Sequence, residues 1–326
     1  VTGCASTHTM KQKVQQAVSP IFLRIEQLDE AKYGFLLVSP VFLVLSVLAF
    51  YPLVRTLYFS LQDDDLTGMH PIGEFVGLEN YVQILSGDAN AILTSPFFDL
   101  QAPFSSALIV TLLITGVSVA IGTLMGLGMA IILNKEFKGR RYARTIVILP
   151  WSIPIVIQGM MFFLLFQPSL SPFVEPLANL GVFSDNPLIN SQDSTIIVIL
   201  IDIWRKIPFI ALIIMAGIAS IDRNLYDVAE VAGATKWQQF RLITLPQIKP
   251  VLFIGMIFYT ISSMKIYGIV EASAGCSTVP TLTCLVVQTF RQQRWATASA
   301  IAFITALVIA VIIMVYVVRY RESTNE

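Results

Sequence analysis

Charged residues are scarce in this chain of 326 residues. Asp, Glu, Lys and Arg make up 13% of it, whereas an ordinary soluble domain carries about a quarter. Apolar residues reach 55%, more than the buried core of a soluble chain of this size needs. The 21 basic and 21 acidic residues balance and no basic arm is present, which argues against nucleic acid as a partner. The composition therefore predicts a chain that has lipid as part of its solvent.

The residues of metal and nucleophile chemistry are also rare. Two histidines, His8 and His70, and three cysteines make no metal-ligand spacing. No Ser/His/Asp or Cys/His set stands out, and no G-x-x-x-x-G-K-[ST] motif occurs that would cradle ATP. We therefore predict a non-catalytic chain with no metal site and no cofactor of its own. Cys276 and Cys284 could pair if their loop faced an oxidising side, but two free thiols are the favoured interpretation.

The first residues resemble part of a targeting signal. The stretch "VTGC" is similar to the end of a lipoprotein signal, but no apolar stretch precedes Cys4. We assign no function to residues 1–10 and treat Met10 as a candidate start.

Six apolar stretches are long enough to cross a bilayer as helices. A bilayer core about 30 Å thick needs about 20 residues of helix. Each stretch contains glycine or proline, which membrane helices tolerate better than soluble ones. The sequence therefore predicts an all-α, polytopic membrane protein with six transmembrane helices. The stretches are 34–60, 104–134, 145–167, 194–221, 250–270 and 298–318.

The distribution of Arg and Lys orients these stretches. Fifteen of the 21 basic residues lie in the two terminal segments or in two of the loops. The three alternate loops, 61–103, 168–193 and 271–297, hold only two. By the positive-inside rule, both termini are predicted to be cytoplasmic, which assigns residues 1–33 and 321–326 to the cytoplasm. The first outer loop carries seven acidic residues and no Arg or Lys, which we interpret as a solvated surface rather than a cation site.

A charged, amphipathic segment, "DVAEVAGATKWQQFRLITLP" (227–246), lies between the fourth and fifth stretches. Asp222 can cap a first helix. Gly233 then interrupts the pattern, where a left-handed turn or a close backbone approach is cheap for glycine. Thr235 and Gln238 can form a capping box for a second helix. The segment is thus predicted to be a helix–Gly–helix loop at the cytoplasmic surface.

Two prolines bound this loop, and small residues mark its middle. Pro246 and Pro250 are expected to end the second helix and to start the fifth span. The small residues allow another protein to come close, so we interpret the loop as a docking element rather than as a lipid-bound helix or an ordinary loop. They are Ala229, Ala232, Gly233 and Ala234.

The same loop resembles the coupling loop of bacterial and archaeal ABC-transporter permeases. The family's loop has the form Glu-Ala-Ala, three residues, Gly, then an apolar stretch that ends in Leu-Pro. Ala229, Gly233 and Ala234 match this form, whereas Asp227 replaces the Glu and Ala232 replaces the usual Asp. The resemblance implies that the loop docks on an ATP-binding subunit. The residues implied for this coupling are Tyr226, Asp227, Ala229, Glu230, Gly233, Ala234, Trp237 and Phe240.

Other stretches extend the resemblance over roughly residues 33–320. "FVGLENYVQIL", "ILPWSIPIVIQGMMFFLLF", "IWRKIPFIALIIMAGIASI" and "TFRQQRWATASAIAFI" are similar to sugar permeases of the maltose and glycerol-phosphate type. At 272–277 the chain has "ASAGCS" where the family often has Thr-x-Gly-Gly-Pro. The resemblance implies an ABC-transporter transmembrane domain over 34–320, with the coupling loop at 222–247, in a bacterial or archaeal cytoplasmic (inner) membrane.

The resemblance also implies partners and a function. Six spans and one coupling loop make half of a pathway, so a second permease subunit is expected, and the family favours a different, homologous chain. Two copies of an ATP-binding subunit would hold ATP and Mg, and an extracytoplasmic solute-binding protein would deliver the solute. The chain would then import a di- or oligosaccharide by alternating access, with glycerol phosphate or another polar solute as the alternative. An ion-coupled secondary transporter and a membrane scaffold without a pathway are further hypotheses, although no convincing internal repeat supports the former.

Charged side chains inside the fourth stretch mark a candidate substrate pathway. Asp202, Arg205 and Lys206 lie near its middle, beside Trp204 and before Pro208. Ionisable groups in a membrane are costly and usually face a cavity or a partner. Aromatic faces and charged hydrogen-bonding groups would suit a sugar, but pairing of Asp202 with Arg205 or Lys206 inside the bundle is the slightly favoured alternative. Further pathway candidates are Gln158, Tyr259, Ser262, Ser263, Lys265 and Tyr267.

Overall fold

The computed structural model describes residues 30–66 and 71–325, and the chain forms two compact units, Val1–Tyr58 and Phe59–Glu326. Regular structure in the described residues is helical, apart from an isolated bridge between Gln62 and Phe75. This confirms the predicted all-α class. The predictions for residues 1–29, including the candidate start at Met10, lie outside the described residues.

The described part of the first unit is one helical run. It consists of α2 (Glu30–Leu45), a π-helical turn η1 (Ser46–Phe50) and α3 (Tyr51–Ser60), whose end passes into the second unit. Pro40 lies inside α2 without ending it. The stretch Leu37–Ser60 is long and apolar enough to cross a membrane.

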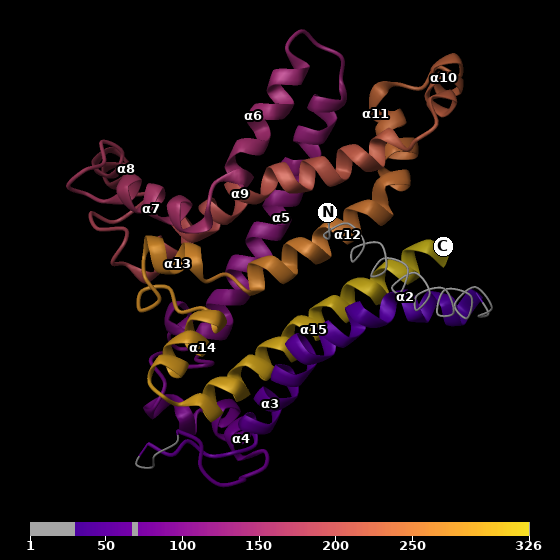
Figure 1. Cartoon of the computed structure of the whole chain (residues 1–326). Coiled ribbons are helices and arrows are strands. Elements are labelled where there is room, and N and C mark those ends of the chain that lie inside the picture. Colours follow the sequence, from indigo (N-terminus) through magenta and orange to yellow (C-terminus); the bar gives the residue numbers. More distant parts are fainter. Residues whose placement is uncertain (1–29, 67–70, 326) are drawn as a thin grey trace, which may run out of the picture. The chain divides into compact units, whose positions relative to one another are not determined.

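The second unit is built around four long helices (Figure 1). They are α5 (Ala107–Asn134), α9 (Ser191–Ala219), α12 (Leu245–Met264) and α15 (Trp295–Asn325). Helix α5 packs along α9, and α12 packs against both. The shorter helices are α4 (Glu79–Ser86), η2 (Asp88–Ala91), η3 (Pro103–Ser105), α6 (Arg140–Ser152), α7 (Ile155–Phe166), α8 (Val174–Asn179), α10 (Arg223–Val231), α11 (Lys236–Gln239), η4 (Phe240–Thr244), α13 (Gly268–Ser273) and α14 (Leu282–Arg291).

Helices α5 and α12 come very close at Gly122. A Cβ atom at this position would lie 2.6 Å from Cε1 of Tyr259, nearer than real side chains approach. Membrane helices commonly meet at such small residues, because packing and not the hydrophobic effect drives their association. Tyr259 is only 1% exposed. Gly122 therefore makes room for a large aromatic ring in the centre of the bundle.

Four stretches of the described residues are long and apolar enough to cross a membrane, and a bent helix pair would make a fifth. Three of the four lie in the second unit, at Ala107–Asn134, Lys236–Met264 and Trp295–Arg321. The predicted stretch 194–221 is largely α9, which has 29 residues but carries three charged side chains near its middle. Six spans were predicted. By length and composition, the described helices confirm four or five of them.

The predicted stretch 145–167 is not one helix, so this prediction of a continuous span was wrong. Helices α6 and α7 are bent by 91° relative to each other. Between them Ile153 is extended, with φ −72° and ψ 135°, because the ring of Pro154 disfavours a helical conformation in the residue before it. Nε2 of Gln158 donates to the carbonyls of Pro150 (2.8 Å) and Ile153 (2.7 Å), which satisfies acceptors that the break leaves free.

The expected helix end at Pro246 and Pro250 was also wrong. The stretch Lys236–Met264 runs as one helix through both prolines. Pro246 lies in the first turn of α12, directly after the π-helical turn η4, and such local adjustments accommodate a missing N–H donor. The second helix of the predicted coupling loop is therefore continuous with a membrane-spanning stretch.

Cys276 and Cys284 form a disulfide, so the favoured interpretation of two free thiols was wrong. The turn between α13 and α14 brings their Cα atoms to 5.5 Å, within the range that a disulfide requires. Both residues are buried. A disulfide persists in an oxidising compartment and is rare in the cytosol.

Asp64, in the acidic segment predicted to be the first outer loop, caps a distant helix and is not simply solvated. Its Oδ1 accepts from the backbone N–H of Ala296 at 2.7 Å. Its Oδ2 accepts from the backbone N–H (3.3 Å) and the hydroxyl (2.6 Å) of Thr297. A carboxylate at a helix N-terminus satisfies free donors and meets the positive end of the helix dipole. The loop is thereby fixed to the start of α15.

Asp64→Ala is expected to lower the free energy of unfolding by about 1–2 kcal/mol, the usual cost of losing a helix cap. Asp64→Asn should cost less, because its amide oxygen still accepts a hydrogen bond. Thermal denaturation of the purified protein measures the difference. The control is Glu74→Ala, which truncates an exposed acidic side chain of the same loop. Equal midpoints for Asp64→Ala and the control would contradict the capping role.

Candidate functional site

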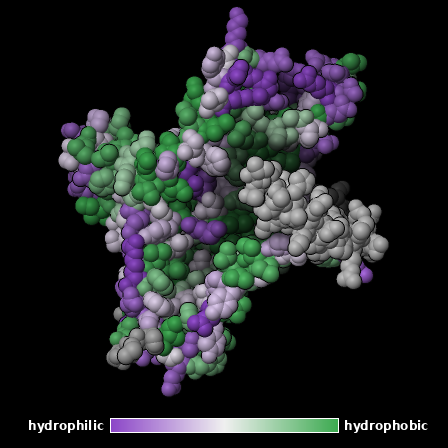
Figure 2. All heavy atoms as spheres, viewed as in Figure 1, coloured by the Kyte–Doolittle hydropathy of each residue, from purple (hydrophilic) through white to green (hydrophobic). Residues whose placement is uncertain are grey.

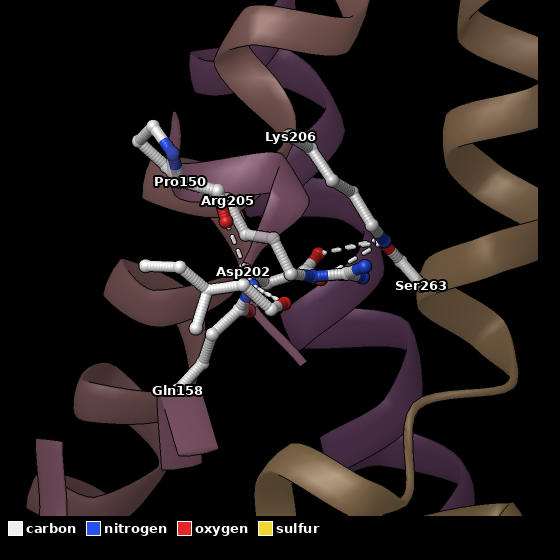
Figure 3. Close-up of polar contacts among 7 residues, drawn as sticks. Pro150, Gln158, Asp202, Arg205, Lys206 and Ser263 are labelled. Atoms are coloured by element: carbon white, nitrogen blue, oxygen red, sulfur yellow. Dashed lines mark hydrogen bonds and ion pairs between the residues drawn. The ribbon is translucent and has the colours of Figure 1, made fainter. Parts of the chain in front are cut away.

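A buried ion pair within α9 is hydrogen-bonded to a serine of α12 (Figure 3). Asp202 is fully buried, and its Oδ1 lies 2.9 Å from Nζ of Lys206, one helical turn further on. From α12, the hydroxyl of Ser263 donates to Oδ2 of Asp202 at 2.6 Å. Nζ of Lys206 also donates to Oγ of Ser263 at 2.6 Å. The three side chains satisfy one another across the interface between the two helices.

The ring of Tyr259 completes the surroundings of Lys206. Its centroid lies 4.8 Å from Nζ, within the range of a cation–π contact. The close approach at Gly122 holds this ring in place from the side of α5. A buried charge is costly unless it is paired and hydrogen-bonded, and Lys206 has both kinds of partner. The arrangement realises the pairing that the sequence analysis favoured.

Arg205 occupies a different position, at the edge of this cluster. Its Nη2 lies 3.4 Å from Oδ1 of Asp202, and its side chain is 12% exposed. Its Nε is buried and has no hydrogen-bond partner among the described residues. Arg205 lines two cavities, of about 610 Å³ and about 180 Å³. It is therefore the member of the cluster best placed to meet a solute.

The walls of these two cavities combine basic, hydroxyl and aromatic groups with isoleucines in the larger one, and no carboxylate is among their lining residues. Phe258 and Ser262 line both cavities together with Arg205. Such walls can donate hydrogen bonds to hydroxyl or anionic oxygens and can stack an aromatic face on a sugar ring. The larger cavity adds Lys265 and Tyr267, and the smaller adds Trp151, Lys206, Phe209 and Tyr259.

Four predicted pathway residues line neither cavity: Asp202 and Ser263 belong to the hydrogen-bonded ion pair, and Trp204 and Gln158 lie elsewhere. Trp204 lines a separate, largely apolar cavity of about 590 Å³, and its ring lies 5.5 Å from that of Phe162. Gln158 is fully buried at the bend between α6 and α7, where its side chain reaches the carbonyl of Pro150 (Figure 3). Neither position places the side chain beside Arg205 on a cavity wall.

Sequence reasoning missed Phe258 and Trp151 as cavity residues. Phe258 lies four residues before Ser262, so the two share one face of α12, and this spacing was a usable signal. Trp151 precedes the bend at Ile153, which was not predicted. Sequence reasoning also missed Arg291 as a partner of Tyr267; Arg291 donates to the hydroxyl of Tyr267 at 3.0 Å.

The predicted helix–Gly–helix loop has the expected local structure. The side chain of Asp222 accepts from the N–H of Asn224 at 3.0 Å and caps α10. The capping box of Thr235 and Gln238 opens α11. Gly233 has φ +80°, the left-handed conformation that favours glycine. The loop is thus a short helix, a left-handed turn and a helix that leads directly into α12.

The loop is largely exposed at the end of the second unit where polar side chains gather (Figures 1 and 2). The hydroxyl groups of Tyr226 and Thr244 lie 2.9 Å apart and connect α10 to η4. The rings of Trp237 and Phe240 pack on each other, with centroids 5.5 Å apart. Of the eight predicted coupling residues, the exposed ones are Asp227, Glu230, Gly233 and Trp237, and the half-buried ones are Tyr226, Ala229, Ala234 and Phe240.

Residues 118–322 match the protein family described as "binding-protein-dependent transport system inner membrane component". This chain belongs to that family. The trehalose/maltose transport system permease protein of Thermococcus litoralis is 31% identical to it, over 90% of this chain and 96% of that relative. The trehalose transport system permease protein of Mycobacterium tuberculosis is 29% identical, over 81% of this chain and 80% of the relative.

A solved structure shares the fold of this permease. The crystal structure of a bacterial ABC transporter involved in the import of the acidic polysaccharide alginate aligns with a TM-score of 0.68. The alignment covers 93% of this chain and 99% of that one, at 22% identity. The alignment therefore extends beyond the segment that matches the family.

Proposed function

We propose that this permease is one transmembrane subunit of an ABC importer and forms half of the pathway for a sugar. Two copies of a partner ATP-binding subunit would hydrolyse ATP with Mg, a second permease would complete the pathway, and an extracytoplasmic binding protein would deliver the solute. Transport would proceed by alternating access. The observation that carries the proposal is the position of Arg205, which lines two cavities and lies beside a satisfied buried ion pair.

A di- or oligosaccharide is the proposed solute. The aromatic, hydroxyl and basic groups around Arg205 suit the ring faces and hydroxyl oxygens of a sugar. Relatives named for trehalose and maltose support this class. A phosphate ester is the second candidate, because Arg205 and Lys265 share a cavity without a carboxylate and because the sn-glycerol-3-phosphate transport system permease protein of Yersinia pestis is 27% identical.

Six spans with both termini in the cytoplasm remain our proposal. Helix α9 would be one of them in spite of its charges, because Asp202 and Lys206 neutralise each other inside the bundle. The bent pair α6 and α7 would be another. The disulfide between Cys276 and Cys284 supports an extracytoplasmic position for their loop.

We expect cysteines introduced at Lys138 and at Asn179, both exposed, to label from opposite sides of the membrane. The background would carry Cys4→Ser, while the paired Cys276 and Cys284 do not react. A membrane-impermeant maleimide added to intact cells should modify Asn179→Cys, and Lys138→Cys only after the cells are opened. Labelling of both positions in intact cells would refute the orientation.

Arg205→Gln is expected to reduce solute uptake about tenfold or more, because hydrogen bonds to a charged group contribute roughly 1.5–3 kcal/mol. Uptake of trehalose, maltose and glycerol 3-phosphate would be measured in vesicles that contain the complete transporter. Complex yield should stay near that of the control Arg321→Gln, which lies at the exposed end of α15. Normal uptake of all three solutes by a well-assembled Arg205→Gln complex would remove Arg205 from the pathway.

A further inference from the structure

We propose that a second cavity, at the coupling-loop end of α5 and α9, binds the phosphate group of an anionic phospholipid. The cavity has a volume of about 600 Å³. Three arginines, Arg140, Arg144 and Arg223, line it, together with Asn134 and Tyr226, and no acidic residue is among its lining residues. It is separate from the cavities around Arg205.

Two of the arginines are held in place by the end of α5. Nε of Arg140 and Nη2 of Arg144 each donate to the carbonyl of Leu133 at 3.1 Å. These bonds satisfy an acceptor that the helix end leaves free, and they use only part of the donors of each guanidinium. Nε of Arg144 is buried and has no hydrogen-bond partner among the described residues. A preorganised set of basic donors therefore converges on one cavity.

The positive charge of the three arginines favours an anionic ligand at this site. Three like charges around one cavity repel one another, and an anionic ligand would offset that repulsion. Guanidinium groups present planar forks of donors that match phosphate oxygens, so arginine is the side chain best suited to this ligand. A phosphate group could thus be bound from several sides by Arg140, Arg144 and Arg223.

The other wall of the cavity favours a lipid as the source of the phosphate. Leu212, Met215 and Ile218 of α9 line the same cavity and provide an apolar surface beside the arginines. Asn134 is the last residue of α5, so the cavity lies where a membrane-spanning stretch ends. Basic pockets between transmembrane helices on the cytoplasmic side commonly hold anionic lipid head groups. Free phosphate would use the arginines but not the apolar wall.

Binding here would connect α6 to α10, the first helix of the predicted coupling loop. Arg140 and Arg144 belong to α6, whereas Arg223 and Tyr226 belong to α10. A phosphate held by both helices would tie α10 to the loop end of α5. This consequence rests on the proposed coupling role of α10, but the binding itself does not, and it can be measured without transport.

The test compares the full-length protein in nanodiscs of phosphatidylcholine alone, of phosphatidylcholine with phosphatidylglycerol, and of phosphatidylcholine with added inorganic phosphate. Thermal denaturation and native mass spectrometry report stabilisation and retained lipid. Phosphatidylglycerol should raise the denaturation midpoint and stay bound. Arg223→Gln should weaken that binding roughly fivefold, the usual contribution of one basic residue near an anionic surface. Arg223 is exposed on the first turn of α10, so its replacement leaves the core intact.

Arg144→Gln should have the same effect, and Arg141→Gln is the matched control, because Arg141 lies on the same helix but does not line the cavity. Unchanged lipid binding in Arg223→Gln and Arg144→Gln would overturn the site. Absence of any stabilisation by phosphatidylglycerol would do so as well. Stabilisation by inorganic phosphate in phosphatidylcholine equal to that by phosphatidylglycerol would overturn the lipid assignment.

Discussion

Lys206→Met is expected to lower the free energy of unfolding by about 3–5 kcal/mol, because it leaves a buried carboxylate without its ionic partner. Asp202 is fully buried, and after the substitution it would keep only the hydroxyl of Ser263 and the more distant guanidinium of Arg205. The protein should therefore denature at a lower temperature, and the yield of folded protein should fall. Arg205→Gln should cost much less, since Arg205 is partly exposed and lies further from the carboxylate.

A double variant separates the loss of a partner from the loss of packing. Asp202→Leu combined with Lys206→Met replaces both charges by apolar groups, and such replacements are often neutral or stabilising. We expect the double variant to recover most of the stability that either single change removes. The measurement is a double-mutant cycle of denaturation midpoints in one detergent. If the costs of the two single changes simply add up in the double variant, the interaction between Asp202 and Lys206 contributes little to stability.

The local features of the predicted coupling loop could be predicted because they depend on near neighbours. Asp222 caps α10 by accepting from the N–H two residues later, and Thr235 and Gln238 complete their box within four residues. Gly233 adopts the left-handed turn that its position in the pattern indicated. In both caps the backbone groups that need a partner and the side chain that supplies it lie within one helical turn.

Features that depend on distant residues could not be predicted in this way. Asp64 caps a helix that starts more than 200 residues later, as the separation of 232 between Asp64 and Ala296 shows. Nothing in the spacing of the acidic residues in the predicted first outer loop identifies this partner. The bend at Ile153 differs, because Pro154 indicates a break in the helix whereas the continuous apolar pattern across 145–167 favours a single span.

The candidate site was predicted in composition but not in arrangement. The positions of Asp202 and Lys206, four residues apart, allowed an ion pair within α9, and the structure contains it. The partner from α12, Ser263, could only be proposed as a candidate, because the facing register of two helices is set by their packing. Trp204 and Arg205 are adjacent in the sequence, yet successive residues of a helix point in different directions, and the two line different cavities.

Gly233→Val is expected to reduce transport about tenfold or more while the spans remain inserted. With φ at +80°, this position holds a conformation that costs an ordinary L-residue roughly 1–2 kcal/mol and a β-branched residue more. A Cβ built at Gly233 has no atom of the chain within 4 Å, so the substitution creates no clash within the described structure. The expected damage is a change in the turn that sets the direction of α10 relative to α11.

Gly233→Asn is the matched variant. It distinguishes a requirement for the left-handed turn from a requirement for free space around Gly233. Asparagine tolerates the left-handed conformation better than other residues but adds a side chain of similar bulk to valine. If the turn alone matters, Gly233→Asn should keep most of the uptake and most of the substrate-stimulated ATP hydrolysis. If a partner backbone must approach Gly233 closely, both variants should lose attachment of the ATP-binding subunit in copurification. Glu230→Lys should reduce transport less than Gly233→Val does. Glu230 and Lys236 form an exposed pair 3.5 Å apart, and such pairs contribute only about 0–1 kcal/mol. A Gly233→Val complex that retains its ATP-binding subunit and transports at the normal rate would show that this loop does not couple ATP hydrolysis to transport.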